Sequence, residues 1–275
     1  MIEDWDDAYA NGAYIEAAAD YPAKWAQTAA RFRQEMTAMR SAELDIVYGE
    51  SERQRLDIFR PPNDPQGLVV FVHGGYWRAF DKSYWSHLAT AAIQRGWAVA
   101  IPSYDLVPTV SISEITRQTG AAIGKAASMI RGSIRLTGHS AGGQLVTRMI
   151  CRDSPLSQAD RQRIERVISI SGLHDMRPLL KTAMNDDFRM NEAEAVAESS
   201  ALNQPIENVE LICWVGADER PEFVRQSELL ANIWSGCGLK TSFHRAPGQH
   251  HFDVIDGLED PRSALSDALL NQAGK

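Results

Sequence analysis

The sequence of 275 residues has few cysteines and no long apolar run. Its three cysteines, Cys151, Cys213 and Cys237, lie far apart, and none belongs to a CxxC pair. A set this sparse excludes a disulfide framework and a cysteine-based zinc site, and it indicates reduced thiols in a cytosol. No apolar run approaches the roughly 20 residues that a membrane-spanning helix needs.

A cluster of basic residues is also missing. The chain has 28 Lys and Arg against 36 Asp and Glu, which gives a net charge of −8. A nucleic-acid-binding protein needs a basic footprint, so this class is excluded. The acidic start, Met1–Asp7, matches neither a secretory nor a mitochondrial signal. We expect a cytoplasmic protein that binds neither nucleic acid nor membrane. Its oligomeric state, including a homodimer, stays open.

Short apolar runs alternate with helix-like stretches along most of the chain. Eight runs are typical of strands: 44–48, 56–59, 68–72, 97–101, 134–137, 167–170, 209–215 and 239–244. Helix-like stretches occupy 82–94, 112–130, 141–151, 222–234 and 262–271. The first two runs form a hairpin, and the alternation of the rest predicts an α/β fold. We expect one domain over residues 1–275, with an eight-stranded, mostly parallel, doubly wound sheet and an antiparallel edge.

Two stretches lie outside this alternation. Residues 1–40 look helical and Ala-rich, with Trp25, Ala29, Phe32 and Met36 at a spacing that predicts an amphipathic helix packed on the body. Residues 174–206 contain helix-forming and polar residues but no strand. This insert is a candidate lid or cap above the strand ends. The alternative is a surface excursion that does not touch substrate.

The strongest motif is Gly138-His139-Ser140-Ala141-Gly142, a G-x-S-x-G pattern between a predicted strand and a predicted helix. In that context the glycines permit a sharp turn that strains the serine backbone and raises its hydroxyl above the sheet. The start of the next helix favours negative charge. Ser140 is therefore the candidate nucleophile, and His139 is expected to pack under the turn.

A serine hydroxyl needs a base to take its proton and an acid to orient that base. In this architecture the acid and then the histidine follow the serine in the chain. Asp218 and Glu219 follow the strand 209–215, and His250 and His251 follow the last strand. Both loops leave the carboxyl ends of strands, where α/β sheets bind ligands. The residue chemistry does not choose within either pair.

The run His73–Trp77 follows the first parallel strand and contains paired glycines. Glycines let the backbone approach a substrate, and N–H groups there stabilise a developing oxyanion. We expect the amides of Gly75, Tyr76 and Ala141 to form this oxyanion hole. His73 is expected to hold the loop by hydrogen bonding.

Aromatic residues gather after this loop. Tyr76 and Trp77 are candidate substrate-binding residues, and with Tyr84 and Trp85 they would form a pocket for an aryl leaving group. The alternative for all four is ordinary packing of the following helix on the sheet.

These motifs together resemble the α/β-hydrolase fold, and HGGYW resembles the kynurenine formamidase (arylformamidase) branch. The similarity runs from about residue 45 to 257. Further segments agree with that family's pattern: 54–59, 104–108, 171–175 and 221–227.

The resemblance implies particular residues for the triad. The family's histidine precedes Phe-Asp or Phe-Glu, which implies His251. Its acid lies three residues after the strand-ending glycine and two before the proline of Pro-Glu-Phe, which implies Glu219, with Asp218 as the fallback. The vertebrate enzymes carry Asp at this place, so the sequence departs from them here.

The resemblance also implies the activity. It indicates a serine hydrolase without metal or organic cofactor that acts on a small molecule. The first expectation is an arylformamidase of tryptophan catabolism, which converts N-formylkynurenine to kynurenine and formate. A carboxylesterase or thioesterase acting on short acyl groups is the alternative, because pocket shape is not readable from the sequence and the fold does not determine the substrate.

Overall fold

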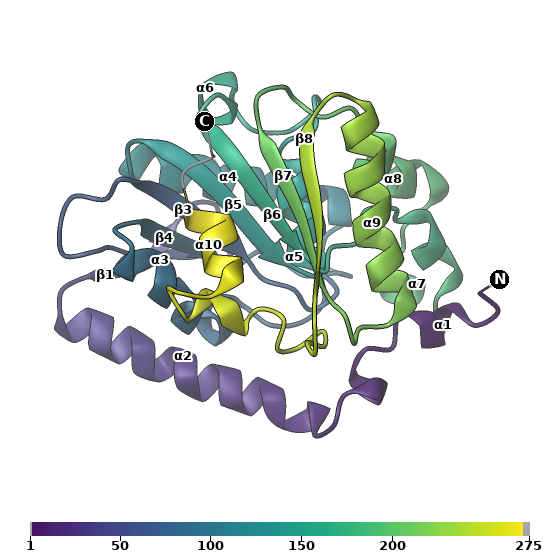
Figure 1. Cartoon of the computed structure of the whole chain (residues 1–275), viewed down its shortest axis with the longest axis horizontal. Coiled ribbons are helices and arrows are strands. Elements are labelled where there is room, and N and C mark those ends of the chain that lie inside the picture. Colours follow the sequence, from purple (N-terminus) through teal and green to yellow (C-terminus); the bar gives the residue numbers. More distant parts are fainter. Residues whose placement is uncertain (1, 272–275) are drawn as a thin grey trace.

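The fold is built around one sheet, in a computed structural model that describes residues 2–271. Its strands are β1 (Ala42–Val47), β2 (Arg55–Phe59), β3 (Gly67–Val72), β4 (Ala98–Pro102), β5 (Ser133–His139), β6 (Ile164–Ile170), β7 (Glu210–Gly216) and β8 (Lys240–Ala246). They lie in the order β1-β2-β4-β3-β5-β6-β7-β8 (Figure 1). Strand β2 is antiparallel to both neighbours, and the strands from β4 to β8 pair in parallel. The predicted eight-stranded sheet with an antiparallel edge is confirmed.

Helices cover both sides of the sheet. They are α1 (Trp5–Ala8), α2 (Tyr21–Ala38), α3 (Thr90–Gln94), α4 (Ile112–Met129), α5 (Ala141–Arg148), α6 (Gln158–Arg161), α7 (Asn185–Phe188), α8 (Glu192–Ala197), α9 (Pro221–Gly236) and α10 (Ala264–Leu270). Short 3-10 turns are η1 (Gly12–Tyr14), η2 (Ala18–Asp20), η3 (Lys82–Tyr84), η4 (Ser86–Ala89), η5 (Arg177–Lys181), η6 (Ser200–Leu202) and η7 (Asp256–Leu258). No helix within residues 2–271 combines the length and apolar character needed to cross a membrane.

Alternate residues of the central strands enter two separate cores, as the period of two in a strand requires. Leu68 and Val70 of β3 pack into the core on the side of α4, α5 and α9. Val69 and Phe71 pack into the other core, on the side of α2, α3 and α10. A strand buried on both faces is typical of a parallel sheet between helical layers.

One predicted helix is broken. The stretch 82–94 folds as η3, η4 and α3. Trp85 sits between the two turns with φ −125° and ψ 2°, outside the helical region, and its ring is buried against Trp25 at a centroid distance of 4.7 Å. Burial of the indole in this aromatic cluster outweighs helical continuity.

The N-terminal part has one long helix and not a helix throughout. Residues 2–20 form α1, η1 and η2, and residue 1 lies outside the described residues. Helix α2 runs along the lower edge of the molecule, below α3 and α10 (Figure 1). Trp25, Ala29 and Met36 are buried, and Phe32 packs half-buried against the same core, which confirms the predicted amphipathic face.

The insert 174–206 consists of η5, α7, α8 and η6, and it adds no strand to the sheet. One buried residue that anchors it is Glu198, whose Oε2 accepts from Thr116 Oγ1 at 2.6 Å and from Arg148 Nε at 3.4 Å. The predicted helical content is confirmed, and the lid role stays a prediction.

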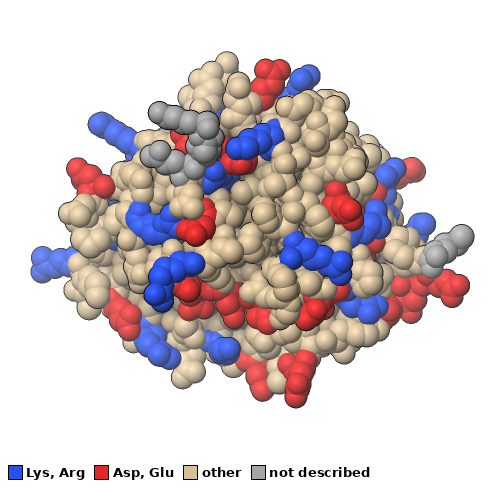
Figure 2. Space-filling model, in the orientation of Figure 1, with Lys and Arg blue, Asp and Glu red and all other residues tan. Residues whose placement is uncertain are grey.

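The surface charge is distributed over the molecule. On the face in Figure 2, acidic and basic side chains are interspersed among uncharged ones. The 28 basic residues, outnumbered by 36 acidic ones, therefore do not gather into a basic patch on this face.

Candidate active site

Ser140 occupies a strained turn between β5 and α5. Its φ of 54° and ψ of −117° lie in a region that non-glycine residues rarely adopt. The flanking glycines make this turn possible because a Cβ at Gly142 would lie 1.9 Å from Val72 O, and one at Gly138 would lie 2.2 Å from Gly142 O. The predicted strand-turn-helix geometry is present.

His251 and Glu219 form a buried pair close to this turn. His251 Nδ1 lies 2.6 Å from Glu219 Oε2, and the two side chains are 5% and 0% exposed. Glu219 Oε1 accepts hydrogen bonds from Ser171 Oγ at 2.5 Å and from Gly216 N at 2.8 Å. Asp218 is exposed. The fold therefore brings Glu219, and not Asp218, to the imidazole.

The other two nearby histidines have different surroundings. His250 Nε2 lies 3.1 Å from the hydroxyl of Tyr21 in α2, outside the pocket described below. His139 Nε2 lies 2.9 Å from His251 O. Burial holds the pKa of His139 well below its usual range, so its ring is neutral and can donate this hydrogen bond. His139 thus supports the backbone of His251.

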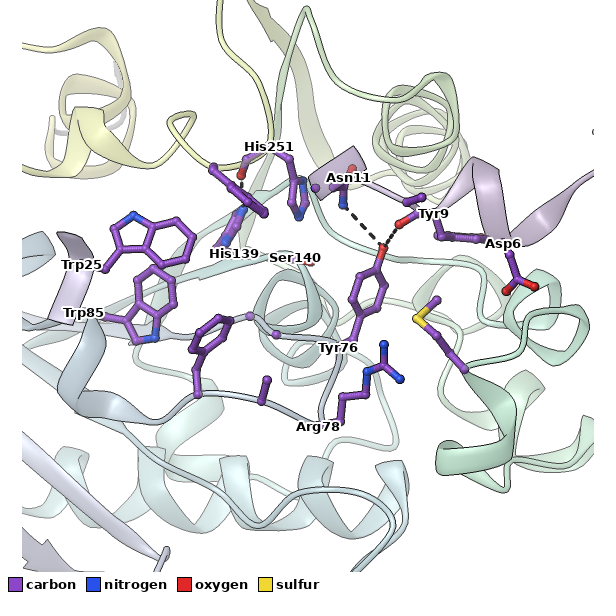
Figure 3. Close-up of a pocket in the computed structure, with 18 residues that line it drawn as sticks. Asp6, Tyr9, Asn11, Trp25, Tyr76, Arg78, Trp85, His139, Ser140 and His251 are labelled. Carbon is purple, nitrogen blue, oxygen red and sulfur yellow. Dashed lines mark hydrogen bonds between the residues drawn. The ribbon is translucent and has the colours of Figure 1, made fainter. Parts of the chain in front are cut away.

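Ser140 and His251 line the same pocket, which has a volume of about 430 Å³ (Figure 3). Within residues 2–271, the His251 ring makes one hydrogen bond, between Nδ1 and Glu219. Its Nε2 is therefore available to a hydroxyl or a substrate, and such contacts often tighten only on substrate binding. The other lining residues are Asp6, Tyr9, Ala10, Asn11, Gly12, Trp25, Gly74, Gly75, Tyr76, Arg78, Ala79, Phe80, Trp85, His139, Met184 and Phe252.

The loop His73–Trp77, called the oxyanion loop below, packs directly on the serine. A Cβ at Gly74 would lie 3.0 Å from Ser140 Cβ. Gly75, Tyr76 and Trp77 have φ values of 107°, 50° and 54°, all in the left-handed region. Three consecutive residues in this region turn the loop sharply over the pocket.

Three amides near the serine have no backbone acceptor. Within residues 2–271, the backbone N–H groups of Gly75, Tyr76 and Ala141 donate to no backbone carbonyl. Ala141 is the first residue of α5, where the helix leaves its N–H groups unpaired. These three amides are those expected to form an oxyanion hole.

His73 stabilises the oxyanion loop by hydrogen bonding and stacking. Its Nδ1 lies 2.7 Å from Gly74 O, and its ring stacks on Tyr104 at 4.3 Å. Burial lowers the pKa of His73 to about 4, so the ring is neutral and its Nδ1–H donates. The Tyr104 hydroxyl donates to His73 O at 2.8 Å. The expected structural role of His73 is present in the geometry.

The aromatic prediction is partly wrong. Tyr76 and Trp85 line the pocket, whereas Trp77 and Tyr84 do not. Trp77 is fully buried, and its Nε1 donates to Gln144 Oε1 at 3.2 Å. The Trp77 ring packs in the core against α5 and does not line the pocket.

Several lining residues were not expected from the sequence. Tyr9, Asn11 and Trp25 come from the N-terminal part, and Phe80 and Phe252 complete an aromatic wall. The helical spacing of Trp25 predicts its burial. No local pattern predicts that residues before position 30 line the same pocket as Ser140, because this placement depends on the tertiary arrangement.

Comparisons with known proteins identify the family of the chain. The BD-FAE family model matches residues 56–229. The kynurenine formamidase of Danio rerio is 31% identical over 84% of this chain and 82% of that protein. The kynurenine formamidase of Drosophila melanogaster is 27% identical over 86% of this chain and 84% of that protein.

Solved structures share the fold. A provisionally named thioesterase from Silicibacter sp. tm1040 is 49% identical, with a TM-score of 0.92 over 97% of this chain and 98% of that chain. An esterase from Pyrobaculum calidifontis, 16% identical with a TM-score of 0.70 over 90% of this chain and 89% of that chain, is similar in fold alone. The chain is a hydrolase that belongs to the BD-FAE family of α/β-hydrolases, within the kynurenine formamidase/esterase group.

Proposed function

We propose that the protein is a serine hydrolase with a Ser140–His251–Glu219 triad, and that it is an arylformamidase converting N-formylkynurenine to kynurenine and formate. The observation that carries this proposal is the aromatic wall beside Ser140, made by Trp25, Phe80, Trp85 and Phe252. Aromatic side chains can stack on the ring of an aryl amine leaving group. The kynurenine formamidase relatives support the same substrate.

The first half of the reaction is acylation. Ser140 Oγ attacks the formyl carbonyl while His251 takes its proton. The Glu219 carboxylate holds Nδ1 of His251 and stabilises the imidazolium that forms. The amides of Gly75, Tyr76 and Ala141 stabilise the tetrahedral oxyanion. His251 then protonates the aniline nitrogen, the C–N bond breaks, and the aryl amine leaves.

The second half releases the formyl group. Water attacks the formyl ester of Ser140 while His251 takes a proton from it, and the oxyanion again forms at the same amides. Collapse of this intermediate returns the proton to Ser140 and releases formic acid, which loses its proton to water and leaves as formate. All bond-making atoms come from the triad, the substrate and water, so the reaction needs no metal or organic cofactor.

The alternative is a carboxylesterase or thioesterase that uses the same triad on short acyl groups. The name of the 49% identical Silicibacter protein favours it. The two activities share the acylation chemistry and differ in the leaving group, so substrate preference separates them.

A paired assay tests both. Wild type and Ser140→Ala are compared on N-formyl-L-kynurenine, followed by kynurenine absorbance, and on p-nitrophenyl acetate. Ser128→Ala, at an exposed serine of α4, is the matched control. We expect kcat/KM for the formamide of about 10⁴ M⁻¹s⁻¹ or more in wild type and in the control, and its loss in Ser140→Ala.

Other outcomes are informative. Ester cleavage that depends on Ser140, without formamide cleavage, would move the function to esterase. Formamide cleavage that survives in Ser140→Ala would exclude the triad.

A further inference from the structure

The N-terminal segment, residues 5–25, joins three loops of the candidate site. The Tyr76 hydroxyl of the oxyanion loop donates to Tyr9 O at 2.7 Å (Figure 3). Asn11 Nδ2 donates to the same hydroxyl at 3.5 Å. Arg220, adjacent to Glu219, pairs with Asp7.

The same segment also reaches the loop that carries His251. The Tyr21 hydroxyl lies 3.1 Å from His250 Nε2. The Trp25 ring packs on Phe252 at a centroid distance of 5.4 Å. The N-terminal segment therefore contacts the oxyanion loop, the residue next to Glu219 and the residues on both sides of His251. The serine turn is the one part of the site for which no such contact is described.

The contact with Tyr76 has the clearest consequence. Tyr76 and Trp77 are consecutive non-glycine residues with φ of 50° and 54°. Such a backbone is disfavoured and persists only where the surroundings hold it. Trp77 is held by its hydrogen bond to Gln144 and by Val107 N, which donates to Trp77 O at 3.0 Å. Tyr76 is held from the N-terminal segment.

The Tyr9 carbonyl is a rigid anchor. Tyr9 is 1% exposed, and its own hydroxyl donates to Glu222 Oε1 at 2.9 Å. Glu222 is also buried, and Arg225 donates to both of its carboxylate oxygens at 2.7 Å. The position of the Tyr9 backbone is thereby tied to α9.

We infer that the N-terminal segment positions the oxyanion hole, and that the hydrogen bond from the Tyr76 hydroxyl to the Tyr9 carbonyl is the contact that does so. The inference rests on the proposed role of the Tyr76 amide. The hydroxyl acts through the loop: it keeps the Tyr76 amide directed at the oxyanion. Loss of this hydroxyl reduces the stabilisation of the transition state. The binding of the ground state, whose reacting carbonyl is planar, stays unchanged.

The test uses Tyr76→Phe, which removes one oxygen atom. Two quantities are measured: kcat/KM for p-nitrophenyl acetate, and Kd for phenylboronic acid by tryptophan fluorescence. The boronate forms a tetrahedral adduct on the serine and so reports the oxyanion hole without turnover. We expect kcat/KM to fall about tenfold and Kd to rise by a similar factor, less than the loss on removing a whole oxyanion donor. The Kd for kynurenine, a product that has lost the acyl group and so places nothing in the oxyanion hole, is expected to stay within about twofold.

The matched control is Tyr48→Phe. The Tyr48 hydroxyl donates to Ser103 O at 2.5 Å, outside the pocket, so its removal deletes the same kind of hydrogen bond. Its thermal stability should fall while kcat/KM and the boronate Kd stay within about twofold. Asn11→Ala is a second variant that weakens the hold on the Tyr76 hydroxyl, and we expect changes in the same direction of about threefold.

A folded Tyr76→Phe protein whose kcat/KM and boronate Kd both match wild type would overturn the inference. A fall in kcat/KM with an unchanged boronate Kd would overturn it too. If Tyr76→Phe does not fold, Asn11→Ala decides by the same criteria. The boronate and the ester do not depend on the formamide, so a wild type that ignores N-formylkynurenine refutes the arylformamidase proposal and leaves this test intact.

Discussion

Glu219 and Asp218 are adjacent in the chain, yet only the Glu219 carboxylate reaches His251. The Asp218 amide donates to Gln249 O at 3.0 Å, and its side chain is exposed. Glu219 instead folds back on Gly216 N, at 2.8 Å. The longer arm of glutamate makes this return possible at a position where aspartate would be shorter by one methylene.

We predict opposite outcomes for the two acids. Glu219→Gln should lower kcat by about 10³ to 10⁴-fold, because an amide cannot hold the tautomer and stabilise the imidazolium as a carboxylate does. Asp218→Asn should stay within about twofold. Steady-state kinetics on p-nitrophenyl acetate check both, and the reverse pattern would assign the acid role to Asp218.

Among the described residues that line the pocket, Arg78 carries a permanent positive charge. Its Nη1 pairs with Asp187 at 2.8 Å, which leaves further N–H donors for a substrate carboxylate. N-formylkynurenine carries such a group and p-nitrophenyl acetate does not.

We therefore predict that Arg78→Gln raises KM for N-formylkynurenine about tenfold, the effect of one charge-assisted hydrogen bond. KM for the ester should not change. Arg117→Gln, an exposed arginine of α4, is the control. An equal change in KM for both substrates would show that Arg78 does not bind the substrate carboxylate.

At the scale of elements, buried polar contacts anchor the insert 174–206, among them those of Glu198 near its C-terminal end. Glu198 is 4% exposed. Besides the contacts of its carboxylate with Thr116 and Arg148, its backbone carbonyl accepts a hydrogen bond from Gln144 Nε2 at 3.0 Å. Gln144 in turn holds Trp77 of the oxyanion loop. The C-terminal end of the insert is thus linked to the site through α5.

Glu198→Ala should destabilise the protein by about 3 kcal/mol, since it leaves buried donors without their acceptor. Glu207→Ala, at an exposed glutamate just after the insert, should change stability by less than about 0.5 kcal/mol. Urea unfolding of the two variants makes the comparison. Similar midpoints for both would mean that the insert is not anchored through Glu198.

Element types were largely predictable from the sequence, because strand and helix periodicities are local properties. The eight strands and the helices α4, α5, α9 and α10 follow from apolar spacing alone. The exception at 82–94 arises from Trp85, whose burial against α2 is a long-range contact that local spacing does not contain.

For the whole molecule, buried histidines connect stability to pH. Burial lowers the pKa of His73 and His87 to about 4 and that of His174 to about 3. In the unfolded chain these rings titrate near 6.5. As pH falls below about 6.5, the unfolded state binds protons that the folded state does not, so stability is lost. Burial also raises the pKa of Asp256 to about 6, which opposes the loss with one proton.

We predict that the free energy of unfolding falls between pH 6.5 and pH 5. His139 is held neutral by burial in the same way, so four uncompensated protons less the one on Asp256 give a limiting slope of about 4 kcal/mol per pH unit. Urea denaturation at pH 7.5, 6.5, 5.5 and 5.0 measures it. His87→Gln removes one of these protons and should reduce the slope accordingly. A free energy of unfolding that does not change with pH would contradict the assignment of these rings as neutral.

The sequence by itself determined the sheet, the serine turn and the order of the loops around it, because glycine spacing and apolar periodicity act over a few residues. Only the tertiary structure decided what surrounds Ser140. It buries Trp77, which the sequence analysis placed in the pocket, and it brings Tyr9, Asn11 and Trp25 to the site from more than 100 residues away. Pocket walls are made where distant elements pack, and packing is a property of the whole chain.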